Sequence, residues 1–222
     1  MKTQVQSRSR GFTLIEMVGV LAIIAILAAL LIPRVFSAIY ESRMSNAVGS
    51  INTVKAATVG YFGKYGRFAG VGGTVITTLP DSAWDKVLIT EGFLERPFQT
   101  KLSSSDQHLV QLVAAPTATT TAPGTADDHR YNLDNDNNNT TDNVGTWVVE
   151  AVIKGVPIQD AIELNKRIDG ELEVQATVET NKKSLAGRVK FEEGTTTSQD
   201  ADGNDVSNPT GLADVYIYIA HK

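Results

Sequence analysis

The feature that most constrains this chain is an apolar run of 21 residues, Phe12–Ile32, in which Glu16 is the only charged residue. A helix of this length covers roughly 30 Å at about 1.5 Å per residue, which is enough to cross the hydrocarbon core of a bilayer. The eleven residues before it carry three basic side chains and no acid. Because basic flanks stay in the cytoplasm, the sequence predicts a single membrane span with a cytoplasmic N-terminus and an exported remainder.

Two common explanations of such a run leave Glu16 unaccounted for. A secretory signal peptide needs small residues at a cleavage site just past the apolar stretch, whereas Pro33, Arg34, Val35 and Phe36 follow here. An uncleaved single-pass anchor is the other explanation. In both, a carboxylate deep in an apolar helix costs about 2 to 3 kcal/mol unless it finds a partner or a proton.

A cut between Gly11 and Phe12 would supply a partner for Glu16. The new α-amino group of Phe12 would be a positive charge one helical turn away in the same chain. A helix N-terminus presents unsatisfied N–H groups and the positive end of the helix dipole, so Glu16 could equally pair with the Phe12 amino group of a neighbouring chain. That second arrangement would join subunits.

The stretch Gly11–Pro33, GFTLIEMVGVLAIIAILAALLIP, resembles the cleavage site and hydrophobic helix of the type IV pilin and pseudopilin family. The resemblance includes the acidic residue five places after the cut and the proline at the helix exit, and it extends over residues 8–61. It implies cleavage after Gly11 by a prepilin peptidase, N-methylation of Phe12, and assembly through a helix in which Glu16 and Pro33 take part.

The same resemblance implies the partners and the location of the protein. The partners would be other subunits in a helical homo- or hetero-filament, the peptidase, an inner-membrane assembly platform, and membrane lipid before assembly. The protein would begin in the bacterial inner membrane and end in a periplasmic or extracellular filament.

Beyond Pro33 the apolar residues recur every three or four positions as far as Tyr61, which predicts an amphipathic continuation of the helix. Pro33 removes one backbone hydrogen bond and Gly60 weakens the helix, so we expect a bend near Pro33 and an end near Gly60. The predicted organisation is a cleaved basic leader (1–11), a transmembrane helix (12–32), its amphipathic continuation (33–61) and a globular head (62–222).

The head is predicted to contain two helices. A short helix should follow Pro80, with Asp81 or Ser82 as its N-cap and Gly92 at its end. A second helix should span Val156–Ile168, with Pro157 in its first turn.

Five runs in the head have the alternation or β-branched content of strands: His108–Ala114, Val144–Ile153, Leu172–Val178, Arg188–Phe191 and Asp214–Ala220. Their patterns favour an antiparallel sheet with one covered face and one polar face. The predicted fold class is therefore α+β and pilin-like, in which the long N-terminal helix, half transmembrane and half amphipathic, packs on a small antiparallel sheet.

Two polar loops, residues 116–143 and 195–209, carry oxygen side chains at alternate positions, a spacing that can wrap a calcium ion. The candidate ligands are Asp134, Asp136 and Asn138 in the first loop and Asp200, Asp202, Asn204 and Asp205 in the second. Neither loop has the glycine and glutamate of an EF-hand, and a solvated turn-rich loop is the alternative. We expect no required cofactor, with calcium as the one that these loops could hold.

Composition excludes several other functions. The absence of cysteine excludes disulfides and thiolate metal sites, and a net charge of -5 argues against nucleic-acid binding. The three histidines lie far apart, and Gly70–Gly73 lacks the lysine of a phosphate-binding loop, so we expect no enzyme.

The leading prediction is a structural subunit of a type IV filament or of a type II secretion pseudopilus. The alternative is a minor pilin or a membrane-anchored surface-binding protein, an adhesin or a DNA-capture protein. Its binding would rest on Lys182, Lys183, Tyr61, Phe62, Tyr65 and Phe68.

Overall fold

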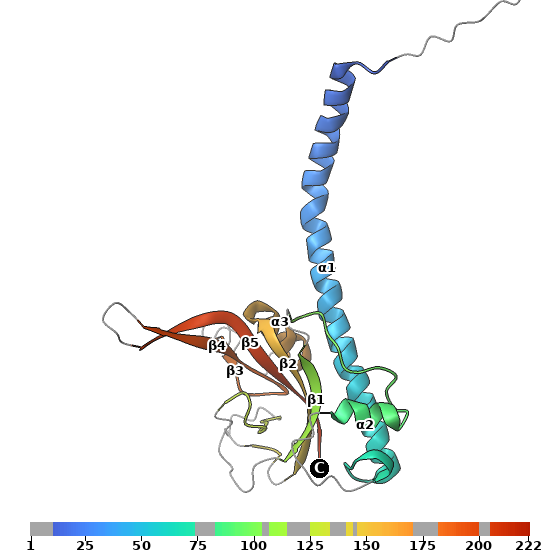
Figure 1. Ribbon diagram of the computed structural model, residues 1–222, viewed down its shortest axis with the longest axis vertical. Coiled ribbons are helices and arrows are strands. Elements are labelled where there is room, and N and C mark those ends of the chain that lie inside the picture. The colour runs from blue at the N-terminus through green and yellow to red at the C-terminus, as the bar shows by residue number, and fades with distance from the viewer. Residues whose placement is uncertain are drawn as a thin grey trace, which may run out of the picture. The chain divides into compact units, whose positions relative to one another are not determined.

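The computed structural model describes residues 11–73, 83–103, 107–114, 125–133, 141–143, 146–170, 182–199 and 205–222 (Figure 1). The elements in chain order are α1 (Leu14–Tyr65), η1 (Val71–Gly73), α2 (Trp84–Thr90), β1 (His108–Ala114), β2 (Trp147–Pro157), α3 (Ile158–Asp169), β3 (Lys183–Ser184), β4 (Val189–Gln199) and β5 (Asp205–His221). The chain divides into two compact units, Met1–Ser42 and Arg43–Lys222.

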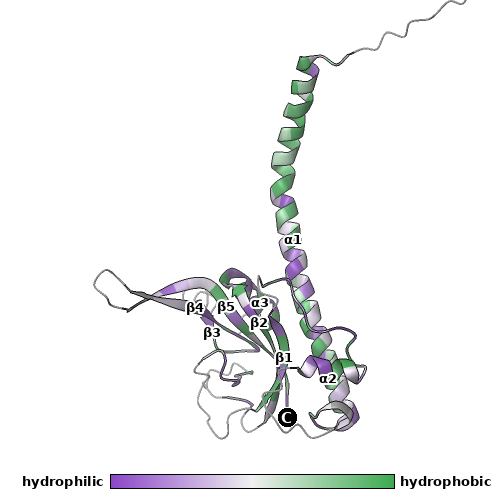
Figure 2. Ribbon diagram, in the orientation of Figure 1, coloured by the Kyte–Doolittle hydropathy of each residue, from purple (hydrophilic) through white to green (hydrophobic). Residues whose placement is uncertain are grey.

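The described part of the first unit is mainly the apolar half of α1, and its side chains are exposed. The helix is long and apolar enough to cross a membrane, and no residue in its most apolar 18-residue window is buried (Figure 2). It is continuous through Pro33, although the proline ring removes the amide that would bond the Ala29 carbonyl. A helix surface with this many exposed Leu, Ile and Val side chains must meet lipid or other apolar helices.

The predicted helix end near Gly60 is wrong, because α1 continues to Tyr65. Gly66 ends it in the left-handed region, with φ 67°, and its amide donates to the Phe62 carbonyl at 2.7 Å. Gly60 instead serves packing, since a Cβ at this position would lie 3.1 Å from the Phe93 ring. A glycine that admits a neighbouring ring looks the same in sequence as a glycine that ends a helix.

The second unit is built on a five-stranded antiparallel sheet in the order β1-β2-β5-β4-β3. One face of the sheet shares a hydrophobic core with the outer half of α1 and with α2 and α3. The members of this core include Met44, Ile51, Val54, Tyr61, Trp84, Leu88, Leu112, Ala151, Ile153, Ile162, Phe191, Val215 and Ile217. The α+β fold predicted from the sequence, a long helix with an antiparallel sheet, is confirmed.

Several element boundaries differ from the prediction. β1 has the predicted bounds, whereas β2 continues to Pro157, so α3 begins only at Ile158. Val156 is still paired with Ala213 of β5, so the helix cannot begin at Val156 as predicted. The N-cap of α2 is Ala83, without a side-chain hydrogen bond, and not Asp81 or Ser82. The predicted strand 172–178 lies outside the described residues.

The predicted polar loop 195–209 is wrong over most of its length, because β4 and β5 extend through it. Thr195 pairs with Pro209, and the ladder continues to Gln199 opposite Asp205. Three consecutive threonines favour an extended backbone, because their β-branched side chains fit a pleated strand. The polarity that suggested a loop reflects the exposure of both faces of these strands.

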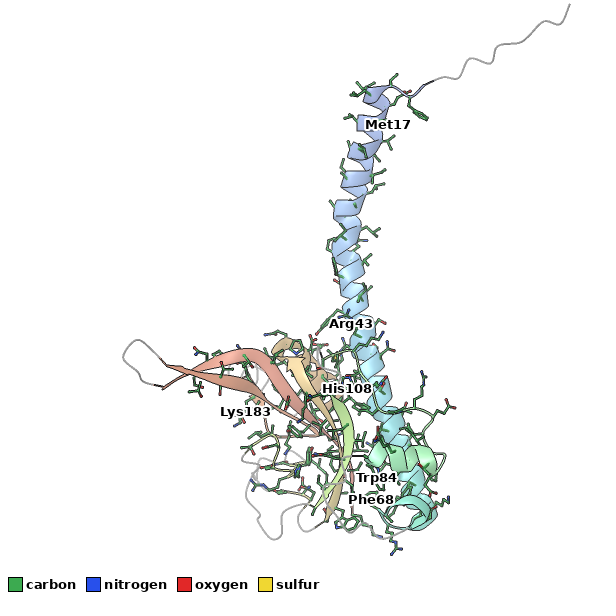
Figure 3. The ribbon with its side chains drawn as sticks, in the orientation of Figure 1. Met17, Arg43, Phe68, Trp84, His108 and Lys183 are labelled. Carbon is green, nitrogen blue, oxygen red and sulfur yellow. The ribbon has the colours of Figure 1, made fainter. Side chains whose placement is uncertain are left out.

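The predicted polar face of the sheet is also covered, by a segment within the predicted loop 116–143. We call residues 125–133 the cover segment. Its Tyr131 is buried and packs with Val113 and Val148 of the sheet. Polar residues that alternate with the core residues, among them Glu150 and Lys190, are therefore buried beneath the cover segment and not solvated (Figure 3 shows the side chains in this region).

Candidate assembly site at the start of the long helix

The predicted cleavage site lies in a non-helical, exposed stretch directly before α1. Residues Gly11, Phe12 and Thr13 precede the first helical residue, Leu14, and Phe12 is 82% exposed. A Cβ at Gly11 would meet no atom within 4 Å. The Gly11–Phe12 peptide bond is thus accessible to a peptidase in the described chain.

Glu16 is held by Thr13 in a capping box. The backbone N–H and the hydroxyl of Thr13 both donate to Glu16 Oε2 at 2.7 Å, and the Glu16 N–H donates to Thr13 Oγ1 at 3.4 Å. Thr13 is the residue before the helix and Glu16 is its third residue, which is the spacing at which the two side chains satisfy each other's backbone N–H groups. Sequence reasoning missed Thr13, although the Thr-x-x-Glu spacing signals it.

The capping box gives the Glu16 carboxylate hydrogen-bond partners but does not neutralise its charge. The carboxylate already has two donors in the uncut chain, so cleavage is not its only source of a partner. Both donors are neutral, however, and the negative charge remains in an apolar segment. Pairing of Glu16 with the amino group of Phe12 stays a prediction.

The structure brings Gly11, Phe12, Thr13 and Glu16 together and leaves Pro33 apart from them. Pro33 follows Glu16 by 17 positions in the same helix, which corresponds to about 25 Å along the helix axis. At Pro33 the Ser37 hydroxyl donates to the Pro33 carbonyl at 3.1 Å. Any role of Pro33 in assembly is therefore separate from the charge at the helix start.

All but one of the calcium candidates lie outside the described residues. Asp134, Asp136, Asn138, Asp200, Asp202 and Asn204 lie outside the described residues, and Asp205 is described only as the first residue of β5. In the part of the chain that the structure describes, no group of three or more His, Cys, Asp or Glu side chains is arranged to hold a metal ion.

The residues that would support a surface-binding function have partners inside the fold. Lys183 donates to Glu192 at 2.9 Å and Lys182 to Glu193 at 3.3 Å. Of the four aromatic residues between positions 61 and 68, two are buried and two pack half-buried against the core. These residues therefore take part in the packing and ion pairs of the second unit, and the surface-binding alternative stays a prediction.

A buried polar network under the cover segment is the other concentration of charged groups. Glu150 is fully buried and accepts from Tyr131 OH at 2.6 Å and from Gln111 Nε2 at 2.5 Å, and its Oε1 lies 2.7 Å from His129 Nδ1. Burial acts to raise the pKa of Glu150, but its bonds to His129, Tyr131 and Gln111 and the charge of His129 lower it overall. Every contact serves to keep this carboxylate charged.

Lys190 completes the network from β4. Its Nζ donates to Asp128 at 2.8 Å and lies 4.4 Å from the ring centre of Tyr131, while Arg130 also binds Asp128 at 2.8 Å. Burial lowers the pKa of Lys190, and the bond to Asp128 opposes that shift. Because Glu150 and Lys190 both have fixed partners on the cover segment, the network holds that segment on the sheet.

Comparison with known proteins assigns the N-terminal segment. Residues 6–32 match a family model described as the prokaryotic N-terminal methylation motif. No curated protein and no solved structure gives a significant match to the chain. The matched segment contains Gly11, Phe12, Thr13 and Glu16, so the start of this chain carries the prepilin-type signal of type IV pilins and pseudopilins.

Proposed function

We propose that this chain is a subunit of a type IV filament or of a type II secretion pseudopilus, cleaved after Gly11 and assembled through α1. The observation that carries the proposal is the methylation motif at residues 6–32. The motif includes the exposed Gly11–Phe12 peptide bond and the apolar start of α1 that follows it. The motif indicates a prepilin-processed, structural protein. The apolar half of α1 fits membrane anchoring before assembly.

The exposed surface of α1 supports assembly through this helix. Leu14, Ile26 and Leu27 are each more than 60% exposed, and at about 100° per residue they project from three different sides of the helix. A helix that is apolar all round needs an apolar environment on every side. Lipid provides it before assembly, and the corresponding helices of neighbouring subunits would provide it in a filament.

The charge of the mature chain agrees with a role for Glu16 at the subunit contact. The leader carries Lys2, Arg8 and Arg10, so its removal takes +3 from a net charge of -5 and leaves -8 before the termini are counted. Copies of such a chain repel one another. A cation created at Phe12 by cleavage, shared with the Glu16 of a neighbour, would be an attraction that the uncut chain lacks.

The N-terminus of the mature protein tests the proposal. We expect mass spectrometry of the full chain, expressed with a prepilin peptidase, to show a protein that begins at Phe12 and carries one added methyl group. A mature protein that still begins at Met1, or that begins downstream of Pro33, would contradict it.

Two glycines provide a matched control for the processing step. A Cβ would meet no atom within 4 Å at either Gly11 or Gly19, so a side chain can begin at either position without a clash in the described chain. We expect Gly11→Leu to abolish cleavage and Gly19→Leu to leave it unchanged.

A further inference from the structure

The ion pair between Lys190 and Asp128 joins two segments that are distant in the sequence. Lys190 lies on β4 and Asp128 on the cover segment, 62 positions earlier, and the Lys190 Nζ donates to Asp128 Oδ1 at 2.8 Å. The side chain of Lys190 is 0% exposed and that of Asp128 is 14% exposed. An amine and a carboxyl group are thus held in contact where little water reaches them.

Burial separates this pair from the other lysine–carboxylate pairs of the second unit. Lys183 and Glu192 are bonded at nearly the same distance, 2.9 Å, but their side chains are 34% and 43% exposed. Lys64 and Lys182, which also pair with glutamates, are exposed to a similar degree or more. Among the residues that the structure describes, Lys190 is the only buried lysine.

The surroundings favour a reaction between the two groups over a lasting ion pair. Two charges that are taken out of water lose their hydration, and conversion of ammonium and carboxylate to a neutral amide would remove both charges. Groups held in contact within one molecule react as if their concentration were on the order of 10⁵ M or more. Burial lowers the pKa of Lys190 overall, although Asp128 and Glu150 oppose that shift. A lower pKa raises the fraction of neutral amine, which is the nucleophilic form.

We propose that Lys190 and Asp128 condense to an intramolecular amide that links the cover segment covalently to β4. A proton passes from Nζ to Oδ1 along the existing hydrogen bond, which gives a neutral amine and a carboxylic acid. The electron pair of Nζ then attacks Asp128 Cγ and forms the Nζ–Cγ bond. The Cγ–Oδ1 bond breaks, and Oδ1 leaves as water with a second proton from Nζ. The products are one amide and one water molecule, and nothing is oxidised or reduced.

The neighbours of the pair suit the charges that develop in this step. Arg130 Nε and Nη2 donate to Asp128 Oδ2 at 3.1 Å and 2.8 Å. Oδ2 gains negative charge when Nζ attacks and becomes the amide oxygen, so Arg130 stabilises it as the donors of an oxyanion hole do. The attacking nitrogen becomes positive at the same moment, and it lies 4.4 Å from the centre of the Tyr131 ring.

The link would give the second unit a covalent cross-link that its composition otherwise excludes. The chain has no cysteine and therefore no disulfide. An amide between residues 128 and 190 would close a long loop and restrict the unfolded chain, as a disulfide does. The inference goes beyond the proposed filament function and does not depend on it.

Mass spectrometry of the purified full-length chain tests the link. We expect an intact mass that is lower, by one water molecule, than the mass calculated for the processed sequence. Trypsin cleaves after lysine and arginine, but not after a lysine whose amine is part of an amide. Digestion should therefore give one branched peptide that joins residues 102–130 to residues 189–222. A full mass, with separate peptides and cleavage after Lys190, would overturn the proposal.

Two lysine variants locate the loss of water. Lys190→Arg keeps a cation beside Asp128 but removes the nucleophilic amine, so it should have the full mass and no branched peptide. Lys183→Arg is the matched control at the exposed pair, and it should keep both the loss of water and the branched peptide.

The peptide map also distinguishes the amide from another dehydration. An aspartate can lose water by closing a ring on its own backbone, which joins no peptides and leaves the bond after Lys190 open to trypsin. Loss of water without a branched peptide, or to the same extent in Lys190→Arg, would therefore overturn the link. Should Lys190→Arg fail to fold, the map of the wild-type chain decides alone.

Discussion

Glu150 and Lys190 show how single residues decide whether a charge can be buried in this fold. Each occupies a sheet position whose neighbours in sequence face the hydrophobic core, and each is fully buried. An unpaired charge in such a place would cost several kcal/mol. Here Glu150 has three partners, and Lys190 has Asp128 and the ring of Tyr131, so the charges fix the position of the cover segment.

We predict that Glu150→Gln destabilises the chain by about 1 to 3 kcal/mol, because a neutral amide accepts weaker hydrogen bonds and presents a donor to groups that already donate. Glu192→Gln is the control. The Glu192 side chain is 43% exposed and pairs with a surface lysine, so this change should stay within about 0.5 kcal/mol. Denaturant unfolding of the full chain in detergent, followed by tryptophan fluorescence, measures both. Equal effects would mean that the network contributes little.

Two glycines have the same backbone conformation but different surroundings. Replacing each by alanine therefore separates the cost of backbone strain from the cost of a steric clash. Gly187 and Gly92 both have φ 76°, but a Cβ at Gly187 would lie 2.5 Å from Asp169 Oδ2, whereas at Gly92 it would meet nothing. Asp169 Oδ2 accepts from the backbone N–H groups of Arg188 and Val189, and a methyl group would displace it.

We therefore predict that Gly92→Ala costs about 1 to 2 kcal/mol, the strain of the left-handed conformation alone. Gly187→Ala should cost about 3 kcal/mol or more, because strain adds to the loss of two hydrogen bonds to a buried carboxylate. The same denaturant experiment compares them. If the two variants are equally stable, the contact with Asp169 does not matter.

At the scale of elements, the first turn of α1 contains the capping box of Glu16 with Thr13, and the proposed charge pair with Phe12 would involve the same carboxylate. Glu16→Gln keeps an acceptor for the Thr13 N–H but removes the charge, whereas Thr13→Val removes the hydroxyl of the capping box and keeps the charge. If the Phe12 charge pair drives assembly, Glu16→Gln should be cleaved normally and yield at least about ten-fold fewer filaments, the effect of about 1.4 kcal/mol.

Thr13→Val should also be cleaved and should retain most of its filaments, because it loses only part of the helix cap, which is worth about 1 kcal/mol. Sheared filaments and N-terminal mass, measured in parallel, distinguish cleavage from assembly. Normal filament yield from Glu16→Gln would refute the charge-pair mechanism, and a larger loss from Thr13→Val would assign the role of Glu16 to the cap.

The elements differ in how far the sequence could predict them. The apolar run, β1 and α3 follow from periodicity, because one local pattern matches one environment. The outer part of β4 could not be recognised as a strand, since Thr195–Thr197 next to an Asp-rich stretch has the composition of a solvated loop, and only the pairing with β5 makes it a strand. Thr13 was recognisable from its spacing to Glu16. The partners of Glu150 were not, because Gln111, His129 and Tyr131 reach it from separate segments.

At the scale of the whole molecule, the sequence predicted a sheet with one solvated face, whereas the structure covers both faces except at the outer parts of β4 and β5. The reason is that an alternation of apolar and polar residues shows only that the two kinds of side chain lie on opposite faces of a strand. It cannot show that a polar residue such as Lys190 is satisfied by a distant segment. The second unit thus has a hydrophobic core on one side of the sheet and a hydrogen-bonded layer on the other, and its stability should depend on pH through the carboxylates that hold these parts.

Glu91 provides the clearest test of that dependence. It accepts from Tyr65 OH at 2.5 Å, from the Gly72 N–H and from Lys64 Nζ at 2.9 Å, and these bonds lower the pKa of Glu91 from 4.5 to about 2. A carboxylate whose pKa falls on folding stabilises the folded chain above its unfolded pKa, and this contribution is lost as pH falls through the folded value. The relevant window is therefore from pH 4.5 down to about 2.

We predict that the free energy of unfolding of the wild-type chain exceeds that of Glu91→Gln by a constant amount above about pH 5, and that this difference shrinks steadily between about pH 4.5 and 2. Glutamine cannot be protonated in this range, so subtracting the two curves removes the contribution of every other carboxylate, including Glu150. Denaturant titrations of both full-length chains at about pH 7, 5, 4 and 3 measure the difference. A difference at the lowest pH as large as at neutral pH would show that the pKa of Glu91 does not change on folding, and that its contacts with Tyr65, Gly72 and Lys64 do not favour its charged form.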